Sequence, residues 1–261
     1  MNLDLKNKTA IVCGATQGIG LGISKELAKE GVNLILVARN KKKLTSCVKA
    51  LPNPKKHSFI CVDFSKPNKL EQELKVYFEK HNKSVHILIN NTGGPKSGSI
   101  ESATNDEFIE AFNMHVLCNQ ILASFVIPGM KRLGYGRIIN IISTSVKIPI
   151  PGLGVSNTIR GAVANWSKTM ANELGEFQIT VNNILPGYTN TARLSSLFEK
   201  MSTSQNKPIK EIEKNIINNV PLKRLGNVSD VANIVTFLAS KRASYISGVN
   251  IPVDGGRTGS L

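Results

Sequence analysis

The chain has 261 residues, 41% of them hydrophobic, and 33 Lys and Arg against 18 Asp and Glu give a formal net charge of +15. That length is enough to bury the core of one α/β domain, so a second domain need not be invoked. The four cysteines lie far apart, with no Cys-x-x-Cys pair and no Cys/His cluster, so neither a disulfide framework nor a metal site is indicated. We expect a cytoplasmic protein without an export signal or a membrane span.

The positive charge favours acidic partners, which can be nucleic acid, an anionic membrane surface, or acidic small molecules and carrier proteins. The lysines are scattered over helical segments and no aromatic side chains are interleaved with them, so nucleic acid is unlikely on this pattern. A solvated basic surface with no partner is an equally simple explanation. Composition does not choose among these.

Seven short runs rich in β-branched residues alternate with longer segments whose apolar residues recur at helical spacing. The predicted strands are residues 9–14, 33–38, 59–64, 86–91, 137–142, 180–185 and 248–253. Such alternation predicts a parallel sheet with right-handed crossovers, and so one doubly wound α/β domain over residues 1–261, with helices flanking a seven-stranded parallel sheet. Residues 189–223, polar and Lys-rich, predict a helical flap over the ligand crevice.

A glycine-rich loop directly follows the first predicted strand and opens the next helix. Glycines at such a turn let the backbone approach a pyrophosphate, whose charge is met by the helix N-terminus. Alone the motif is weak, but the strand and helix around it indicate a Rossmann-type dinucleotide site. Its predicted contacts are Gly14, Thr16, Gln17, Gly18, Ile19 and Gly20.

Arg39 stands at the end of the second predicted strand, where an acidic residue would accept the ribose 2′-hydroxyl of NAD. A guanidinium there can pair with a 2′-phosphate, so NADP(H) is favoured over NAD(H). The alternative is that Arg39 merely faces solvent.

From about Leu5 to Gly256 these motifs resemble, in order, those of the short-chain dehydrogenase/reductase family, and most closely the 3-oxoacyl-acyl-carrier-protein reductases. The resemblance implies an active-site serine at Ser143 and a homotetramer paired through the helices after strands four and five and through the last strand, near Val253-Asp254-Gly255-Gly256. It also implies cofactor contacts at Asp63 and Phe64, at Asn91, Thr92 and Gly93, and at Pro186, Gly187 and Thr189.

The sequence departs from that family at the catalytic pair. Family members carry Tyr-x-x-x-Lys thirteen residues after the serine, where this chain has Ser156 and Arg160, and no Tyr-x-x-x-Lys occurs anywhere in it. The family's helix-four asparagine corresponds by spacing to His115. Three of the four usual catalytic positions are therefore changed.

These changes remove the usual proton donor, because a serine hydroxyl and a guanidinium are poor acids near neutral pH. Arg160 can still hold ribose hydroxyls and stabilise an alkoxide, while Ser143 polarises the carbonyl, so we expect a slow enzyme. His115, of the right pKa class, or Tyr188, on the Pro-Gly loop, can be the substitute donor. The alternative explanation for both is packing, and for His115 also a role as a water-holding substitute for the asparagine.

Two functions follow. The first is an NADP(H)-dependent oxidoreductase that reduces a small-molecule ketone or acyl thioester, such as a 3-oxoacyl thioester, for which the charge of +15 suits an acyl carrier protein. The second is a protein that keeps the cofactor site but has lost turnover, and works as a scaffold or regulator. Ser143 favours the first, because a pure binding module has no use for a carbonyl-polarising hydroxyl. The sequence names neither the substrate nor the direction of the reaction.

Overall fold

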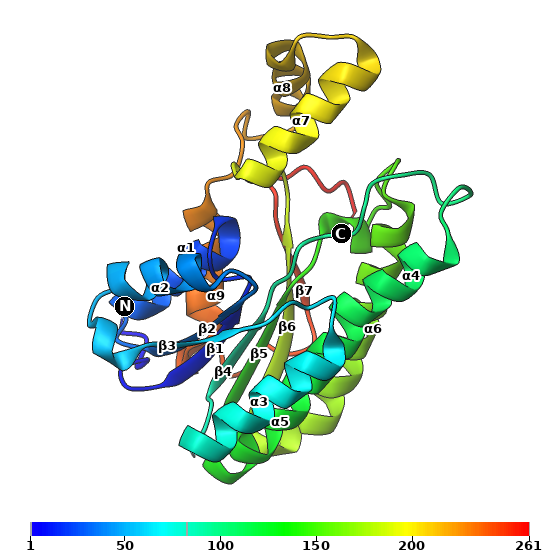
Figure 1. The fold of residues 1–261 in the computed structure, drawn as a ribbon. Helices are drawn as coiled ribbons and strands as arrows, with labels where there is room; N and C mark the ends of the chain where they lie inside the picture. Colours follow the sequence, from blue (N-terminus) through cyan, green and yellow to red (C-terminus); the bar gives the residue numbers. More distant parts are fainter. Residues whose placement is uncertain (1, 82, 261) are drawn as a thin grey trace.

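The computed structural model describes residues 2–81 and 83–260 and has one seven-stranded sheet in the order β3-β2-β1-β4-β5-β6-β7 (Figure 1). Every neighbouring pair is parallel, which confirms the doubly wound α/β prediction. The strands are β1 (Thr9–Cys13), β2 (Asn33–Ala38), β3 (Ser58–Cys61), β4 (Ile87–Asn90), β5 (Gly136–Ile141), β6 (Ile179–Pro186) and β7 (Asn250–Val253).

Helices cover both faces of this sheet (Figure 1). One face carries α1 (Gly18–Lys29), α2 (Lys41–Ala50) and α9 (Val228–Leu238), and the other carries α3 (Pro67–His81), α4 (Asn105–Phe112), α5 (Cys118–Leu133) and α6 (Gly154–Leu174). In β1, Ala10 and Val12 belong to the first core, and Ile11 and Cys13 to the second. Alternate side chains of a central strand thus enter two separate cores, and for this reason every residue of the strand is apolar or small.

Residues 105–133 form one continuous helix, in which the π-helical turn η2 (Asn113–Leu117) joins α4 to α5. The helix is long and apolar enough to cross a membrane by length and composition. Its buried side chains, including Cys118, Leu122 and Val126, instead pack in the core on the sheet. We therefore interpret it as a core helix.

Four asparagines form a ladder across β4, β5, β6 and β7, at positions that are paired in the sheet register. Asn90 Nδ2 donates to Asn140 Oδ1 at 2.7 Å, Asn140 Nδ2 to Asn183 Oδ1 at 3.0 Å, and Asn183 Nδ2 to Asn250 Oδ1 at 2.8 Å. Buried amides are stable only when paired, so the ladder fixes the strand register near the carboxyl edge of the sheet.

Two predicted strand ends differ from the structure by more than one residue. Strand β3 ends at Cys61, three residues before the predicted boundary at 64, because the Asp63 carboxylate accepts the Ser65 N–H at 3.0 Å and turns the chain. Strand β7 begins at Asn250 and not at 248, because Gly248 has a φ of 73°, in the left-handed region outside extended backbone.

The predicted flap contains α7 (Ala192–Gln205) and α8 (Ile209–Asn218), which project beyond the carboxyl ends of the strands (Figure 1). The two helices share a small apolar cluster of Leu194, Phe198, Ile212 and Ile216. This cluster is separate from the two cores of the sheet, so the pair packs mainly on itself.

Candidate active site

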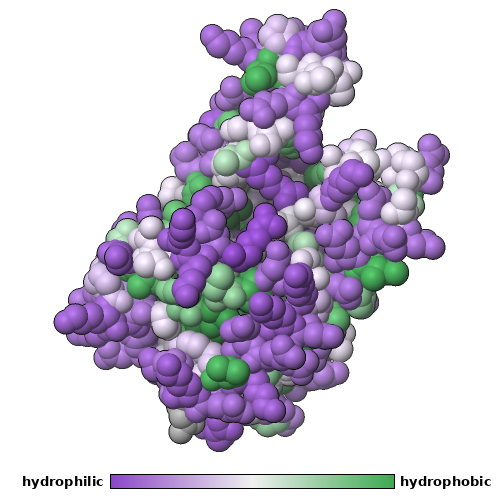
Figure 2. Space-filling model, viewed as in Figure 1, coloured by the Kyte–Doolittle hydropathy of each residue, from purple (hydrophilic) through white to green (hydrophobic). Residues whose placement is uncertain are grey.

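A cavity of about 480 Å³ lies at the carboxyl edge of the sheet, with α7 forming part of its wall. In the space-filling view a notch opens beneath the α7–α8 pair, and the surface around it is mostly hydrophilic (Figure 2). Among the residues selected from the sequence, those that line the cavity are Ile19, Asn91, Thr92, Ser143, Ser156, Arg160, Pro186, Gly187 and Thr189. The topology thus brings together segments from β1 to β6.

The glycine-rich loop is held against the end of β4 by Asn91, whose Nδ2 donates to the Cys13 carbonyl at 3.2 Å. A Cβ on Gly14 would lie 2.6 Å from the Asn91 carbonyl oxygen, and a Cβ on Gly20 would lie 2.7 Å from Asn91 Nδ2. Any side chain at either position would displace this contact. The bare backbone therefore leaves the open turn that a pyrophosphate needs.

The N-terminus of α1 faces the same crevice. Gln17, the N-cap residue, makes no side-chain cap, and the first turn of α1 carries no acidic residue. Unsatisfied N–H groups at such a terminus suit an anion. Thr191, which the sequence interpretation did not select, lies over this turn, with its Cγ2 3.4 Å from a Cβ placed on Gly18. These residues fit the pyrophosphate of a dinucleotide.

Arg39 directly follows β2, with its Nη1 3.9 Å from Asp63 Oδ2 and its side chain 80% exposed. The N–H of Ser65, and to a smaller extent Arg39, lower the pKa of Asp63. An ion pair this long and exposed contributes little, which leaves the guanidinium available to a 2′-phosphate. Phe64 is buried in the core, and its carbonyl accepts a hydrogen bond from the Cys118 thiol at 3.3 Å.

Ser143 and Ser156 present hydroxyl groups to the cavity. Ser143 Oγ accepts the Ser145 N–H at 3.1 Å, which orients it at the end of β5. Ser156 is 5% exposed, in the first turn of α6, and its hydroxyl makes no hydrogen bond with the described residues. An unpaired hydroxyl at a cavity wall is free to bind a ligand oxygen.

Arg160 lies one helical turn beyond Ser156 and is 7% exposed. Its Nη1 donates to the Ile141 carbonyl at 3.2 Å, and the rest of the guanidinium faces the cavity. Burial and the charge of Arg193 lower the pKa of Arg160 to about 10. It remains a cation at neutral pH, and its remaining donors are available to ribose or alkoxide oxygens.

His115 lies in η2 behind Thr92 and does not line the cavity. Its Nδ1 is 2.9 Å from Thr92 Oγ1, and its Nε2 is buried without a hydrogen-bond partner among the described residues. Burial, together with Arg160 and Arg193, lowers the pKa of His115 to about 3. The imidazole is therefore neutral near pH 7 and holds no imidazolium proton to give. This geometry weighs against His115 as the proton donor and suits a hydrogen-bond partner of Thr92.

Tyr188 and four cations complete the cavity wall. The ring of Tyr188 carries the Arg257 guanidinium at 4.7 Å from its centroid. The cationic side chains are Lys96, Arg193, Lys200 and Arg257, and sequence reasoning selected none of them. These four side chains come from segments far apart in the chain and meet only in the folded protein. A single Arg or Lys in a polar segment forms no motif, so the sequence did not identify them. Gly93, Thr16 and Gln17, which the sequence also selected, are not among the residues that line this cavity.

A parallel α/β sheet with a glycine-lined crevice at its carboxyl edge defines a dinucleotide-binding oxidoreductase. Comparison with known proteins agrees: residues 14–258 match the family model described as enoyl-(acyl carrier protein) reductase. The dehydrogenase/reductase SDR family member 4 of Oryctolagus cuniculus is 30% identical, over 98% of this chain and 96% of that protein. The 3-oxoacyl-[acyl-carrier-protein] reductase FabG of Staphylococcus epidermidis is 31% identical, over 96% and 98%.

Among solved structures, YwfH, an NADPH-dependent reductase involved in bacilysin biosynthesis, superposes with a TM-score of 0.92 at 27% identity, over 98% of this chain and all of that one. The chain belongs to the short-chain dehydrogenase/reductase family, whose members are NAD(P)-dependent oxidoreductases, and it is similar to the 3-oxoacyl-acyl-carrier-protein reductases within it.

Proposed function

We propose that the protein is an NADPH-dependent reductase of a ketone, with a rebuilt catalytic pair. The observation that carries the proposal is that Ser143, Ser156 and Arg160 line one cavity together with the Pro186–Gly187 loop. Two hydroxyls and one guanidinium around a single space are the donors that a developing alkoxide needs. A protein that only bound a dinucleotide would have no need for them.

When bound, NADPH supplies a hydride to the carbonyl carbon, and the C=O electron pair moves to oxygen. Ser143 and Ser156 donate hydrogen bonds to that oxygen, and Arg160 stabilises its charge. Tyr188, the phenol in the cavity wall, gives its proton to the alkoxide and regains one from solvent. His115 acts indirectly, by orienting the Thr92 hydroxyl.

The preference for NADPH rests on Arg39, an exposed guanidinium at the place that the 2′-phosphate would take, with no strong partner to compete. The NADPH-dependent YwfH supports the same choice. By similarity to FabG, the substrate is a 3-oxoacyl thioester or a similar ketone, free or on an acyl carrier protein. The family resemblance of the sequence adds a cytoplasmic homotetramer to the proposal.

The test is NADPH oxidation by purified protein with a panel of ketones that includes acetoacetyl thioesters. Turnover that falls in Ser143→Ala and in Arg160→Met, with NADPH affinity retained, is the expected result. The competing function is a cofactor-binding scaffold or regulator. The scaffold or regulator function is supported if NADPH binds, the wild-type protein reduces no ketone, and turnover appears only in the double variant Ser156→Tyr/Arg160→Lys.

A further inference from the structure

The charged side chains that line the cavity are all cationic. Among its described lining residues are five cations, Lys96, Arg160, Arg193, Lys200 and Arg257, and there is no Asp or Glu. A wall of one charge sign in a partly dry space favours ligands of the opposite sign. These five cations differ in whether a hydrogen bond or an ion pair within the protein already engages them.

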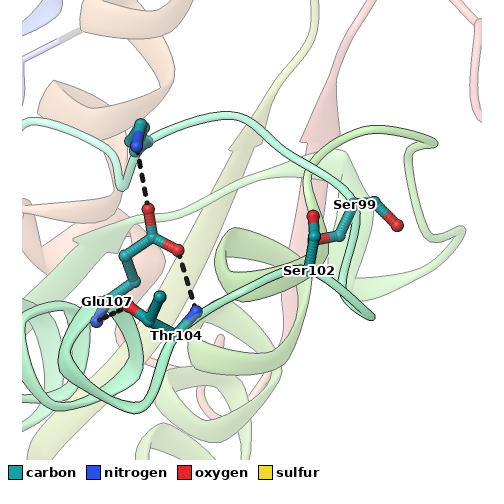
Figure 3. A network of polar contacts seen from close by, with 5 residues as sticks. Ser99, Ser102, Thr104 and Glu107 are labelled. Carbon is teal, nitrogen blue, oxygen red and sulfur yellow. Dashed lines mark hydrogen bonds and ion pairs between the residues drawn. The ribbon is translucent and has the colours of Figure 1, made fainter.

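Lys96 has a partner. Its Nζ lies 3.1 Å from Glu107 Oε1, and Glu107 also belongs to the capping box of α4, where it accepts the Thr104 N–H at 3.1 Å while Thr104 Oγ1 accepts the Glu107 N–H at 3.3 Å (Figure 3). Glu107 is thus held in place at the start of the helix. The charge of Lys96 is compensated at the rim of the cavity.

Arg257 and Arg160 are also engaged in part. Arg257 lies over the Tyr188 ring, and Arg160 donates to the Ile141 carbonyl. Arg160 has a second role in the proposed chemistry. Lys200 makes no hydrogen bond or ion pair with the described residues and stands on an exposed turn of α7, where a lysine needs none.

Arg193 is the exception. It lies in the first turn of α7, and its guanidinium packs on the bare backbone of Gly94, where an added Cβ would lie 2.6 Å from Arg193 Cζ. It makes no hydrogen bond or ion pair with any described residue, although burial by the surrounding protein lowers its pKa. The group is crowded by atoms of the cavity wall yet open to the cavity, so a ligand can reach it.

Arg137 shows how this fold treats a buried guanidinium that has a structural role. It donates to the carbonyls of Gly136 at 2.7 Å, Gln178 at 3.2 Å and Ser240 at 3.2 Å. Arg193 has no such acceptors, and its charge is near enough to Arg160 to lower the pKa of that group. Arg193 is exposed to solvent, so its N–H donors stay available to water or to an anion that enters the cavity.

We propose that Arg193 binds a carboxylate of the substrate, so that the ketone reduced in this cavity is an oxo acid. The proposal rests on the proposed reductase function. A guanidinium presents two parallel N–H donors that match a carboxylate, and Arg257 and Lys200 add positive charge to the same wall. Arg193 and Arg160 line the same cavity, so a carboxylate on Arg193 and a carbonyl near Arg160 would belong to one short oxo acid.

The cofactor's own phosphates are the competing anions. The open N-terminus of α1 and Arg39 already suit the pyrophosphate and the 2′-phosphate. Arg193 instead lies against Gly94 and acts electrostatically on His115 and Arg160, at the reacting end of the crevice. Its position therefore favours the substrate over the cofactor.

The test measures calorimetric binding to the protein–NADP⁺ complex, which needs no turnover. Pyruvate, acetoacetate and levulinate are each compared with their methyl esters, in wild type, Arg193→Gln, Arg193→Lys and the control Arg132→Gln, which changes an exposed arginine at the end of α5. We expect at least one acid to bind about 10- to 100-fold more tightly than its ester, a preference lost in Arg193→Gln, partly kept in Arg193→Lys and unchanged in Arg132→Gln.

Three results would overturn the proposal: no acid preferred over its ester, a preference that survives Arg193→Gln, or a loss of NADPH affinity of tenfold or more in Arg193→Gln, which would make Arg193 a cofactor ligand. Acid binding that depends on Arg193 in a protein that reduces nothing would instead reject the reductase function and keep the acid site. Reduction of neutral thioesters, with no preference for an acid over its ester, would keep the reductase function and reject the acid site.

Discussion

The two ends of the crevice are built differently. At the cofactor end the backbone dominates, because Gly14, Gly20 and the N-terminus of α1 leave space and unpaired N–H groups. At the reacting end side chains dominate, and Ser156, Arg160 and Arg193 form a surface of hydroxyl and guanidinium groups. Under the proposed function, cofactor binding would depend mainly on the backbone of the fold, while proton transfer and substrate choice would depend on a few exchangeable side chains.

The largest effect is expected for Arg160→Met, which keeps an unbranched apolar stem and removes the guanidinium and its charge. We expect kcat to fall by about 10²- to 10³-fold, because the alkoxide loses its nearest cation, with NADPH affinity reduced only a few-fold. Stopped-flow NADPH oxidation and a fluorescence titration measure the two quantities separately. Unchanged turnover would show that Arg160 is only a packed, buried cation.

Tyr188→Phe and His115→Gln separate the two candidate proton donors. Tyr188 lines the cavity and His115 does not, so we expect Tyr188→Phe to lower kcat about 100-fold and His115→Gln to lower it less than tenfold. The measurement is the pH profile of kcat for both variants beside wild type. A larger loss of kcat in His115→Gln than in Tyr188→Phe would identify His115 as the proton donor.

Gly20→Ala tests the cofactor end. The added Cβ would lie 2.7 Å from Asn91 Nδ2 and 2.8 Å from the Gly14 carbonyl carbon, so the loop must shift. We expect NADPH affinity to fall by more than about 30-fold. Gly161→Ala, on α6 with nothing within 4 Å of the added Cβ, is the matched control and should bind normally. Equal affinity in the two variants would contradict the placement of the pyrophosphate.

Arg39→Ala tests cofactor choice. Loss of a charge-assisted contact to the 2′-phosphate should weaken NADPH binding by about tenfold and leave NADH binding nearly unchanged. The ratio of the two dissociation constants, measured by fluorescence at fixed salt, reports the effect. An equal change in the dissociation constants of NADPH and NADH would mean that Arg39 does not contact the 2′-phosphate.

The smallest effect concerns stability against acid. The pKa of His115 is about 3 in the folded chain and about 6.5 when unfolded, so the unfolded state takes up the proton first and stability falls as pH drops below about 6.5. Between about pH 7.5 and 5.5 we expect a loss of about 1.4 kcal/mol in wild type that is absent from His115→Asn. Urea unfolding at the two pH values measures this loss of unfolding free energy. An equal loss in wild type and in His115→Asn would mean that His115 is in contact with solvent.

The sequence predicts the fold well, and it locates the glycine-rich loop between the first strand and the first helix, because both depend on local patterns. Seven apolar runs are long enough to identify strands, and the glycine loop lies within a few residues of β1 and α1. Strand ends were less predictable, as Asp63 and Gly248 show, because a single turn or a positive φ sets them. The asparagine ladder had no local signal, because its members are partners only in the folded sheet.

The reacting end was predicted only where spacing within the chain fixes position, as for Ser143, Ser156 and Arg160. His115 was found by spacing too, but its burial behind Thr92 and its lowered pKa depend on neighbours that the sequence does not reveal. Arg193 was missed because the glycine on which it packs, Gly94, is about a hundred residues earlier in the chain.

The most direct test of the central claim, that Ser156 and Arg160 replace the usual pair and still support reduction, is a single turnover. Protein loaded with NADPH is mixed with a ketone substrate, and the loss of NADPH fluorescence is followed in wild type and in Ser156→Tyr/Arg160→Lys. The account predicts loss of the signal in wild type at a measurable rate, which slows in Ser143→Ala. A stable signal in wild type, with reaction only in the double variant, would contradict it.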